Sequence, residues 1–342
     1  MAIRLKDIAQ ELGVSTVTVS KVLRGKRDVG ARMRALVLKR MSELNYRPNL
    51  LARGLASGRS FAAGLVVPDL IHPFFGEFAT SLGNALRKHG LALMVSSSRE
   101  DIETEQRETL ALLDRGVDVL LLASCQPAHS TPPVFRQVRT PILLVDRNFP
   151  KLKANFVGSD DVAVGKLATR HLLAIGRRRI AHIGVQNVST SIDRLRGYRE
   201  TLAEAGVTAK KNYIVAGERF EETADRVGYE SMRQLLRLKQ PPDAVFCYSD
   251  LCAIGAMQAA IEADVRVPQD IAFVGCGNFR YASYLRIPLS SVDHGTGLMG
   301  KSAAAMALRL IATPDAPVQT LLLKPILVVR KSSATGAGRR SG

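Results

Sequence analysis

Apolar residues at helical spacing open the chain. They recur over residues 5–12, again over 16–23 and a third time over 32–44, which predicts three short helices. Gly13 interrupts the first two helices, and Ser15 is a good N-cap for the second. The pattern favours a small helical head that is either a helix-turn-helix or an ordinary helical hairpin with a third helix.

The pattern changes after a short connecting segment. Pro48 should end the third helix, and residues 49–56 are too few to hold a helix alone. From Phe61 onward, short apolar runs alternate with amphipathic stretches. The expected strands are 63–68, 91–95, 117–122, 142–145, 180–183, 213–215, 244–247 and 271–274. The expected helices between them include 74–89, 104–115, 161–175, 193–205, 222–238 and 250–263. Strands separated by helices predict parallel sheets, and two groups of strands predict two doubly wound lobes.

Charge divides the chain at the same place. The net charge of the 342 residues is +17, and residues 1–60 hold 13 Lys and Arg against 4 Asp and Glu. Residues 324–342 hold 5 Lys and Arg and no acidic residue, so the long middle is nearly neutral. A compact basic N-terminus predicts a head that binds a polyanion, with solubility alone as the alternative. Only 5% of residues are aromatic, which disfavours a stacking platform for single strands.

The sequence lacks the familiar motifs of catalysis and metal binding. It has no phosphate-binding loop, no G-x-S-x-G elbow and no H-E-x-x-H helix. No two of its four cysteines form a C-x-x-C pair; they are Cys125, Cys247, Cys252 and Cys276. Neither a zinc site nor a disulfide framework is therefore expected. His182, inside an expected strand, should be a packed core or edge residue rather than a ligand.

The expected location follows from similar observations. The N-terminus, MAIRLKDIAQEL, has no apolar run before a cleavage site, and no stretch of about 18 apolar residues occurs. Scattered thiols fit a reducing compartment. We therefore expect a cytoplasmic protein that is not an enzyme and has no cofactor, no metal and no membrane partner.

Two adjoining segments near the N-terminus carry a family resemblance. The run LKDIAQELGVSTVTVSKVL, followed by LNYRPNLLARGLASGRS, closely resembles the head and hinge of the lactose-repressor (LacI/GalR) family. Later segments such as GLVVPDLIHPFF, VGSDDVAVGKLATRHLLAIGRRRIAHIG and RVPQDIAFVG are similar to recurring segments of its body. The resemblance covers about residues 3–330. It implies a homodimeric repressor that binds a palindromic operator on double-stranded DNA under the control of a small-molecule effector.

The expected fold class is α/β, with a small all-α helix-turn-helix head and a two-lobed body like that of periplasmic binding proteins. The body is built from doubly wound parallel sheets. The expected domains are a head over 1–48, a hinge helix and linker over 49–60, a body over 61–330 and a disordered tail over 331–342. Within the body, the N-lobe is expected over 61–158 plus 294–320, and the C-lobe over 159–293 plus 321–330.

The second helix of the head is the expected DNA reader. Its inward face leaves Thr16, Val17 and Lys21 outward, and by resemblance these occupy the base-reading positions of the family. Lysine can donate to guanine O6 and N7, and a valine methyl can touch a thymine methyl. A phosphate contact is the alternative for Lys21. Ser15 can cap the helix and also bind a phosphate.

The hinge is expected to enter the minor groove. By resemblance, Leu55 wedges between base pairs, with Asn49 and Ala52 in the same segment. The alternative is that its leucines pack on the body. Residues 49–56 are expected to be helical only on operator DNA.

The effector is expected between the two lobes. By resemblance and by their places near strand ends, the candidate contacts are His72, Phe74, Phe75, Asp146, Arg194, Phe220, Ser249 and Asn278. Aromatic rings can cover an apolar face of a sugar or base, and a carboxylate can accept from hydroxyl groups. Arg194 matches the arginine of a family segment and could hold a carboxylate bidentately. For each residue, an ordinary structural role is the alternative.

The sequence departs from the family at three positions. Gly30 stands where Ser or Thr often caps the third helix, which glycine also tolerates. Gly277 replaces the aspartate that neutral-sugar binders usually carry, and Ser249 replaces a usual asparagine. The lost carboxylate, with Arg194 kept, favours a sugar acid or another anion beside the ordinary sugars.

Two other functions compete with a ligand-controlled repressor. The body would also fit a solute-binding protein for transport, but the basic head and the absent signal peptide disfavour that. A doubly wound enzyme is disfavoured by the missing phosphate loop and catalytic cluster.

Overall fold

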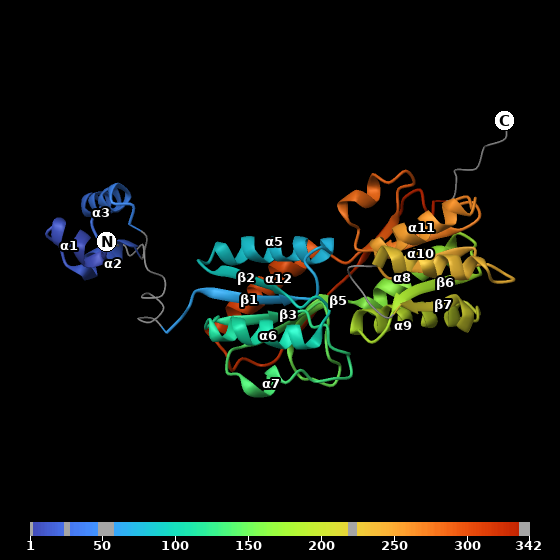
Figure 1. Ribbon diagram of the computed structural model, residues 1–342, viewed down its shortest axis with the longest axis horizontal. Helices are drawn as coiled ribbons and strands as arrows, with labels where there is room; N and C mark the ends of the chain where they lie inside the picture. The colour runs from blue at the N-terminus through green and yellow to red at the C-terminus, as the bar shows by residue number, and fades with distance from the viewer. Residues whose placement is uncertain (1–2, 24–27, 47–57, 218–223, 335–342) are drawn as a thin grey trace. The chain divides into compact units, whose positions relative to one another are not determined.

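The chain forms two separate units, residues 1–60 and residues 61–342. A computed structural model describes residues 3–23, 28–46, 58–217 and 224–334 (Figure 1). The hinge predicted over 49–56, with Asn49, Ala52 and Leu55, lies outside the described residues. So do Phe220 and residues 335–342 of the predicted tail.

The head contains the three predicted helices, α1 (Leu5–Glu11), α2 (Thr16–Leu23) and α3 (Ala31–Glu43). Their apolar faces share one small core that includes Ile8, Val19, Val22, Val37 and Met41. Gly13 has a φ of +64° in the turn between α1 and α2, a conformation that glycine adopts without strain. The Ser15 hydroxyl accepts a hydrogen bond from the Thr18 amide at 3.1 Å, which is the predicted N-cap.

The body contains two six-stranded sheets within its described residues. The N-lobe sheet is wholly parallel, with the strand order β11-β5-β4-β3-β1-β2. Its strands are β1 (Ala62–Val67), β2 (Ala92–Ser97), β3 (Val119–Leu122), β4 (Ile142–Val145), β5 (Asn155–Ser159) and β11 (Thr320–Leu323). Its helices are α5 (Pro73–Arg87), α6 (Ile102–Asp114), α7 (Val134–Gln137) and α12 (Thr296–Ala312).

The C-lobe sheet has the order β12-β10-β9-β8-β6-β7, and its edge strand β12 is antiparallel to β10. Its strands are β6 (Ile180–Val185), β7 (Ile214–Gly217), β8 (Ala244–Cys247), β9 (Ala272–Cys276), β10 (Ser290–Asp293) and β12 (Ile326–Val328). Its helices are α8 (Asp161–Ala174), α9 (Ser189–Glu204), α10 (Ala224–Leu236) and α11 (Asp250–Glu262), with short 3₁₀ turns at Lys211–Tyr213 and Arg280–Ser283.

The central strands β1, β3, β8 and β9 are buried on both faces, which is why they are apolar runs rather than alternating ones. In β1, Leu65 and Val67 belong to the core under α5 and α12. Val66 belongs to the core on the opposite face, which α6 and α7 cover (Figure 1). In the C-lobe, α10 and α11 cover one face and α8 and α9 the other. Because helices cover the faces of the sheets, the loops that follow the carboxyl ends of the parallel strands are the segments at which the two lobes meet.

Two predicted boundaries are wrong. Residues 321–323 were assigned to the C-lobe, but β11 pairs in parallel with β5, so the chain leaves the N-lobe only after Leu323. Residues 331–334 were assigned to a disordered tail, but Ser332 is buried and its hydroxyl donates to the Phe273 carbonyl at 2.7 Å. The same hydroxyl accepts from the Ser290 amide at 2.8 Å, so Ser332 satisfies backbone groups of β9 and β10, a role that polarity alone does not reveal.

His182 is a packed core residue, as predicted. Its ring is stacked between Tyr198 and Phe246, and Nδ1 donates to the Phe246 carbonyl at 3.0 Å. Burial lowers the pKa of His182 to about 4. Between about pH 4 and 6.5, the ring is therefore neutral in the folded protein but protonated in the unfolded chain.

We predict that His182→Leu changes the pH dependence of stability. Because the folded pKa is lowered, the stabilisation is complete above pH 6.5 and is lost as pH falls toward 4. As the pH falls through this window, the free energy of unfolding of the wild-type protein should decrease by about 1.4 kcal/mol per pH unit more than that of the variant. Denaturant titrations from pH 7 to 4.5 measure this, with the exposed His129→Leu as control. Parallel curves for wild type and His182→Leu would contradict the burial argument.

Candidate DNA-reading face and interlobe site

The outward face of α2 is the candidate DNA-reading face. Val19 and Val22 are buried in the head core, whereas Thr16 is exposed and Val17 is 57% exposed. A large apolar side chain that is left in solvent on a short helix serves no packing role, so it is available to touch a thymine methyl. The predicted positions Thr16, Val17 and Lys21 therefore lie on the face turned away from the core.

Lys21 has a partner that sequence reasoning missed. Its ammonium lies 2.6 Å from Oδ2 of Asp28, which stands just before α3. Both side chains remain partly exposed. The predicted base-reading cation is thus held in an ion pair at the surface of the free head.

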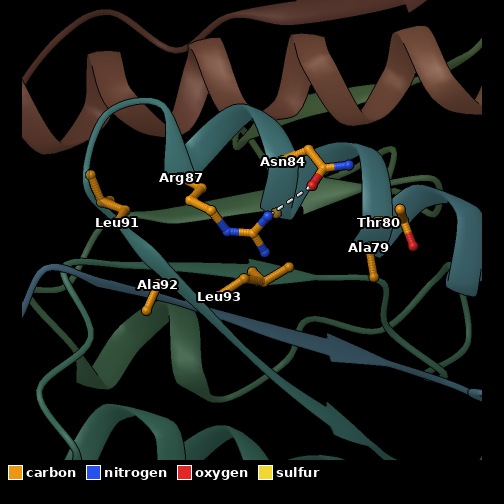
Figure 2. A pocket seen from close by; sticks show the side chains of 8 residues that line it. Ala79, Thr80, Asn84, Arg87, Leu91, Ala92 and Leu93 are labelled. Atoms are coloured by element: carbon orange, nitrogen blue, oxygen red, sulfur yellow. Dashed lines mark hydrogen bonds between the residues drawn. The ribbon is translucent and has the colours of Figure 1, made fainter.

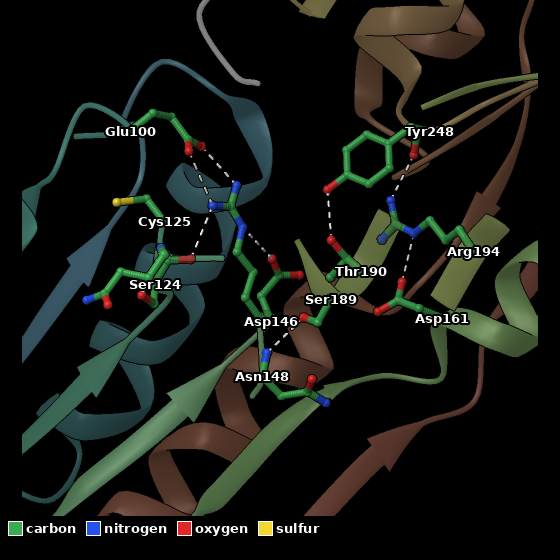
Figure 3. A network of polar contacts seen from close by, with 12 residues as sticks. Glu100, Ser124, Cys125, Asp146, Asn148, Asp161, Ser189, Thr190, Arg194 and Tyr248 are labelled. Atoms are coloured by element: carbon green, nitrogen blue, oxygen red, sulfur yellow. Dashed lines mark hydrogen bonds and ion pairs between the residues drawn. The ribbon is translucent and has the colours of Figure 1, made fainter. Parts of the chain in front are cut away.

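In the body, polar side chains gather where the strands of the N-lobe sheet end (Figure 3). Arg147, which follows β4, is buried and pairs with Glu100 at 2.9 Å. Its guanidinium also donates to the Ser124 carbonyl at 3.2 Å. Asp146, one of the predicted effector contacts, lies 4.0 Å from the same guanidinium and has a φ of +61°. Aspartate tolerates this left-handed backbone conformation better than most residues do.

The C-lobe presents a second buried guanidinium on its side of the network. Arg194 on α9 donates to Asp161 at 2.7 Å and to the Tyr248 carbonyl at 2.8 Å. Its guanidinium carbon also lies 4.6 Å from the centre of the Tyr248 ring, and the Tyr248 hydroxyl bonds to Thr190. Figure 3 shows these four residues as one group beside the N-lobe group. Arg194 is therefore committed to its own lobe through two of its donor atoms.

Several contacts join the lobes directly. The backbone amide of Asn148 donates to the Ser189 hydroxyl at 2.9 Å, and the backbone amide of Ala128 donates to the backbone carbonyl of Asn187 at 2.8 Å. Phe279, which follows β9 of the C-lobe, is buried in the core cluster of the N-lobe. The lobes are thus in contact at their strand ends, where ligands of doubly wound folds bind.

The structure brings only some of the predicted effector residues into this network. Asp146 and Arg194 belong to it, and His72 meets Phe279 edge-on with ring centroids 5.3 Å apart. Phe74 and Phe75 are 3% and 2% exposed and pack in the N-lobe core. Their role as ligand contacts stays a prediction.

The other two described candidates hold local structure. The Ser249 hydroxyl caps α11 by accepting from the Cys252 amide at 3.3 Å. The Asn278 side chain donates to Asp293 at 3.0 Å and accepts from Arg330 at 2.6 Å. Any contact they make with an effector would add to these bonds.

Sequence reasoning missed most of the network. The residues it missed include Glu100, Ser124, Arg147, Asn148, Asp161, Ser189, Thr190 and Tyr248. A signal was present for some, because Asp146, Arg147 and Asn148 directly follow the buried strand β4, which ends at Val145. Glu100 gave no such signal, since its pairing with Arg147 spans 47 positions.

Burial sets the protonation of the interlobe residues. It lowers the pKa of His72 to about 4, and the Arg147 charge adds to this. Burial also raises the pKa of Asp161, and the adjacent Arg194 charge opposes that rise and favours the ionised carboxylate. His72 is therefore neutral at pH 7 and adds no charge to the site. Within the described residues, no cluster of His, Cys, Asp and Glu could hold a metal ion, and no helix could span a membrane.

A groove of about 440 Å³ lies elsewhere, on the N-lobe between α5 and β2 (Figure 2). Thr80, Asn84 and Arg87 line it from the helix, and Leu93 lines it from the strand. The strand β2 is an edge of the sheet, and its Met94 and Val95 are more than a third exposed. An apolar sheet edge beside a groove is a surface suited to another chain.

Comparison with known proteins places the chain in a family. Residues 4–49 match the bacterial regulatory proteins of the lacI family, and residues 169–333 match a periplasmic binding protein-like domain. The ribose operon repressor of Haemophilus influenzae is 33% identical over 329 residues, covering 96% of this chain and 98% of that protein. The transcriptional repressor PurR of Proteus mirabilis is 33% identical over 337 residues, covering 97% of each. The chain belongs to the lacI family of DNA-binding transcriptional repressors.

Solved structures show the same architecture. A complex of the transcriptional regulator CelR with cellobiose is 29% identical, with a TM-score of 0.73, and the match covers 96% of this chain and 99% of that one. The lac repressor dimer bound to operator and the anti-inducer ONPF has a TM-score of 0.86 at 24% identity, covering 98% and 100%. The predicted fold class, a helix-turn-helix head with a two-lobed body, is confirmed.

We predict that Arg194→Ala destabilises the body by about 3 kcal/mol or more, because it leaves Asp161 and the Tyr248 carbonyl buried without their partner. Arg196→Ala on the same helix removes an exposed arginine and should cost less than about 0.5 kcal/mol. Denaturant unfolding of both variants measures the difference. Equal stability of the two would show that the buried pair does not hold the C-lobe together.

Proposed function

We propose that this repressor binds a palindromic operator as a homodimer and that a small molecule between its two lobes controls its affinity for DNA. The observation that carries the proposal is the exposed face of α2, with Thr16, Val17 and Lys21 outward on a basic head. A regulator of this kind acts in the cytoplasm, where the DNA is, and has no catalytic role. The similarity to a relative named as the ribose operon repressor supports a role in DNA binding.

The body supplies a surface for the second copy. The groove between α5 and β2, next to the exposed Met94 and Val95, is available on a lobe that has no DNA-reading task. A two-fold dimer through this face would present two heads to the two halves of a palindrome.

The effector that fits best is a neutral, hydroxyl-rich molecule rather than the sugar acid that the sequence suggested. Both interlobe guanidinium groups already have a carboxylate, Glu100 for Arg147 and Asp161 for Arg194. An anion would have to compete with these carboxylates in a buried setting, which is costly. A neutral hydroxyl group would not. Asn148 Oδ1 is buried with no hydrogen-bond partner among the described residues, so it can accept from such a hydroxyl.

We predict that Lys21→Ala lowers operator affinity by about 1–3 kcal/mol and leaves affinity for random DNA less affected, because one base contact is lost. Arg34→Ala should weaken both equally and flatten the salt dependence, because phosphate contacts carry no sequence information. The probe is a duplex selected from random sequence by the full-length protein, with a scrambled duplex as control. Equal losses on both duplexes for Lys21→Ala would reassign Lys21 to the phosphate backbone.

We predict that neutral sugars bind at least about tenfold more tightly than their anionic counterparts. An anionic ligand would leave a buried carboxylate or its own charge unpaired, and the free-energy cost of this exceeds the roughly 1.4 kcal/mol that corresponds to a tenfold change in affinity. Calorimetry on the full chain with ribose against ribose 5-phosphate, and glucose against glucuronate, measures this. Tighter binding of the anionic member of a pair would show that one of the two arginines exchanges its carboxylate for the ligand. The same ligand should change the affinity for the selected duplex.

A further inference from the structure

The head carries four acidic residues, and one of them faces the DNA-reading helix. Asp7 accepts from the backbone amide of Arg4, whereas Glu11 and Glu43 both engage Arg40 on α3. Asp28 instead reaches Lys21, with its Oδ2 2.6 Å from Nζ. A carboxylate beside the proposed base-reading cation weakens the attraction of that cation to DNA phosphates, so its presence at this position calls for an explanation.

We propose that Asp28 is a specificity-determining residue, which positions the Lys21 ammonium for base reading and cancels its charge on DNA that lacks the recognised base. The inference rests on the proposed function, in which Lys21 reads a base. It adds a residue that acts through another and that itself touches no base.

The position of Asp28 is fixed by its neighbour. Val29 is buried in the head core, with Val19 and Val22 of α2 in the same cluster. The backbone at Asp28 is therefore anchored against the helix that carries Lys21. A long lysine side chain in solvent samples many rotamers, so an ion pair with a carboxylate carried on this anchored backbone reduces the entropy that is lost on binding.

The ammonium group can serve Asp28 and a base together. It has three donors, and one directed at Asp28 leaves two for acceptors on DNA. Guanine presents O6 and N7 as neighbouring acceptors in the major groove. On a recognised guanine, Lys21 therefore keeps the Asp28 bond and adds base contacts.

On other DNA the pair acts differently. Binding to random sequence depends on the cations that neutralise phosphates and release counterions. With its charge cancelled by Asp28, Lys21 contributes little to this term. Asp28 thus lowers the affinity for random DNA more than the affinity for the operator.

The test compares Asp28→Asn with Glu43→Gln in the full-length protein. Each variant removes one negative charge from the head, but Glu43 pairs with Arg40 and Lys39 on α3 rather than with Lys21. Affinities are measured by fluorescence anisotropy on the selected duplex and the scrambled duplex, from 0.05 to 0.3 M salt. Thermal unfolding checks that both heads remain folded.

For Asp28→Asn, we expect affinity for the scrambled duplex to rise about fivefold at 0.15 M salt, with a slope steeper by about 0.9, as for one added phosphate contact. Operator affinity should rise less or fall, so the ratio of the two affinities drops by at least about threefold. For Glu43→Gln the ratio should stay unchanged. An unchanged ratio in Asp28→Asn overturns the inference, as does an equal drop in both variants.

Lys21→Ala separates the two hypotheses. If it loses operator preference while Asp28→Asn keeps it, base reading by Lys21 stands and the role of Asp28 fails. If Lys21→Ala weakens both duplexes alike, the base-reading assignment itself fails and the inference falls with it. In the Lys21→Ala background, Asp28→Asn should no longer change the ratio.

Discussion

The buried guanidinium of Arg194 imposes a constraint on which the geometry of the C-lobe depends. A charge that is enclosed by protein must be neutralised and hydrogen-bonded where it lies. Asp161 supplies the opposite charge, and the Tyr248 carbonyl accepts a second hydrogen bond. The contacts join the start of α8, the body of α9 and the end of β8. The segments that face the N-lobe are therefore held as one group.

The backbone makes this pairing possible. A Cβ on Gly165 of α8 would lie 2.1 Å from the carbonyl oxygen of Arg194, and one on Gly197 of α9 would lie 2.1 Å from that of Val162. The two helices thus touch backbone to backbone, which only glycine permits at both positions. This close crossing brings Asp161 and Arg194 within 2.7 Å. Two glycines therefore set the geometry of a charge pair in the site.

Local sequence patterns were sufficient to predict most of the secondary structure. Helical spacing predicted α1, α2 and α3, and apolar runs predicted eight of the strands. Sequence reasoning missed β5, β10, β11 and β12. Ser290–Asp293 has only one apolar residue, whereas β11 and β12 are mostly apolar but only four and three residues long. Sequence reasoning also missed the pairing of Arg147 with Glu100 and of Lys21 with Asp28, because ion pairs between distant positions leave no periodic signal. Arg194 was expected as a candidate effector contact, but its partner Asp161 was not, and the pairing removes the reason to favour a sugar acid over an ordinary sugar.

We propose that a ligand bound between the lobes of each chain changes the affinity of the paired heads for DNA. Native mass spectrometry of the full-length protein with the selected duplex, titrated with the neutral sugar that binds best, tests this most directly. We predict a complex of two chains and one duplex, whose abundance changes as each chain takes up one ligand. Uptake of the ligand by both chains with no change in the amount of the DNA complex would contradict it.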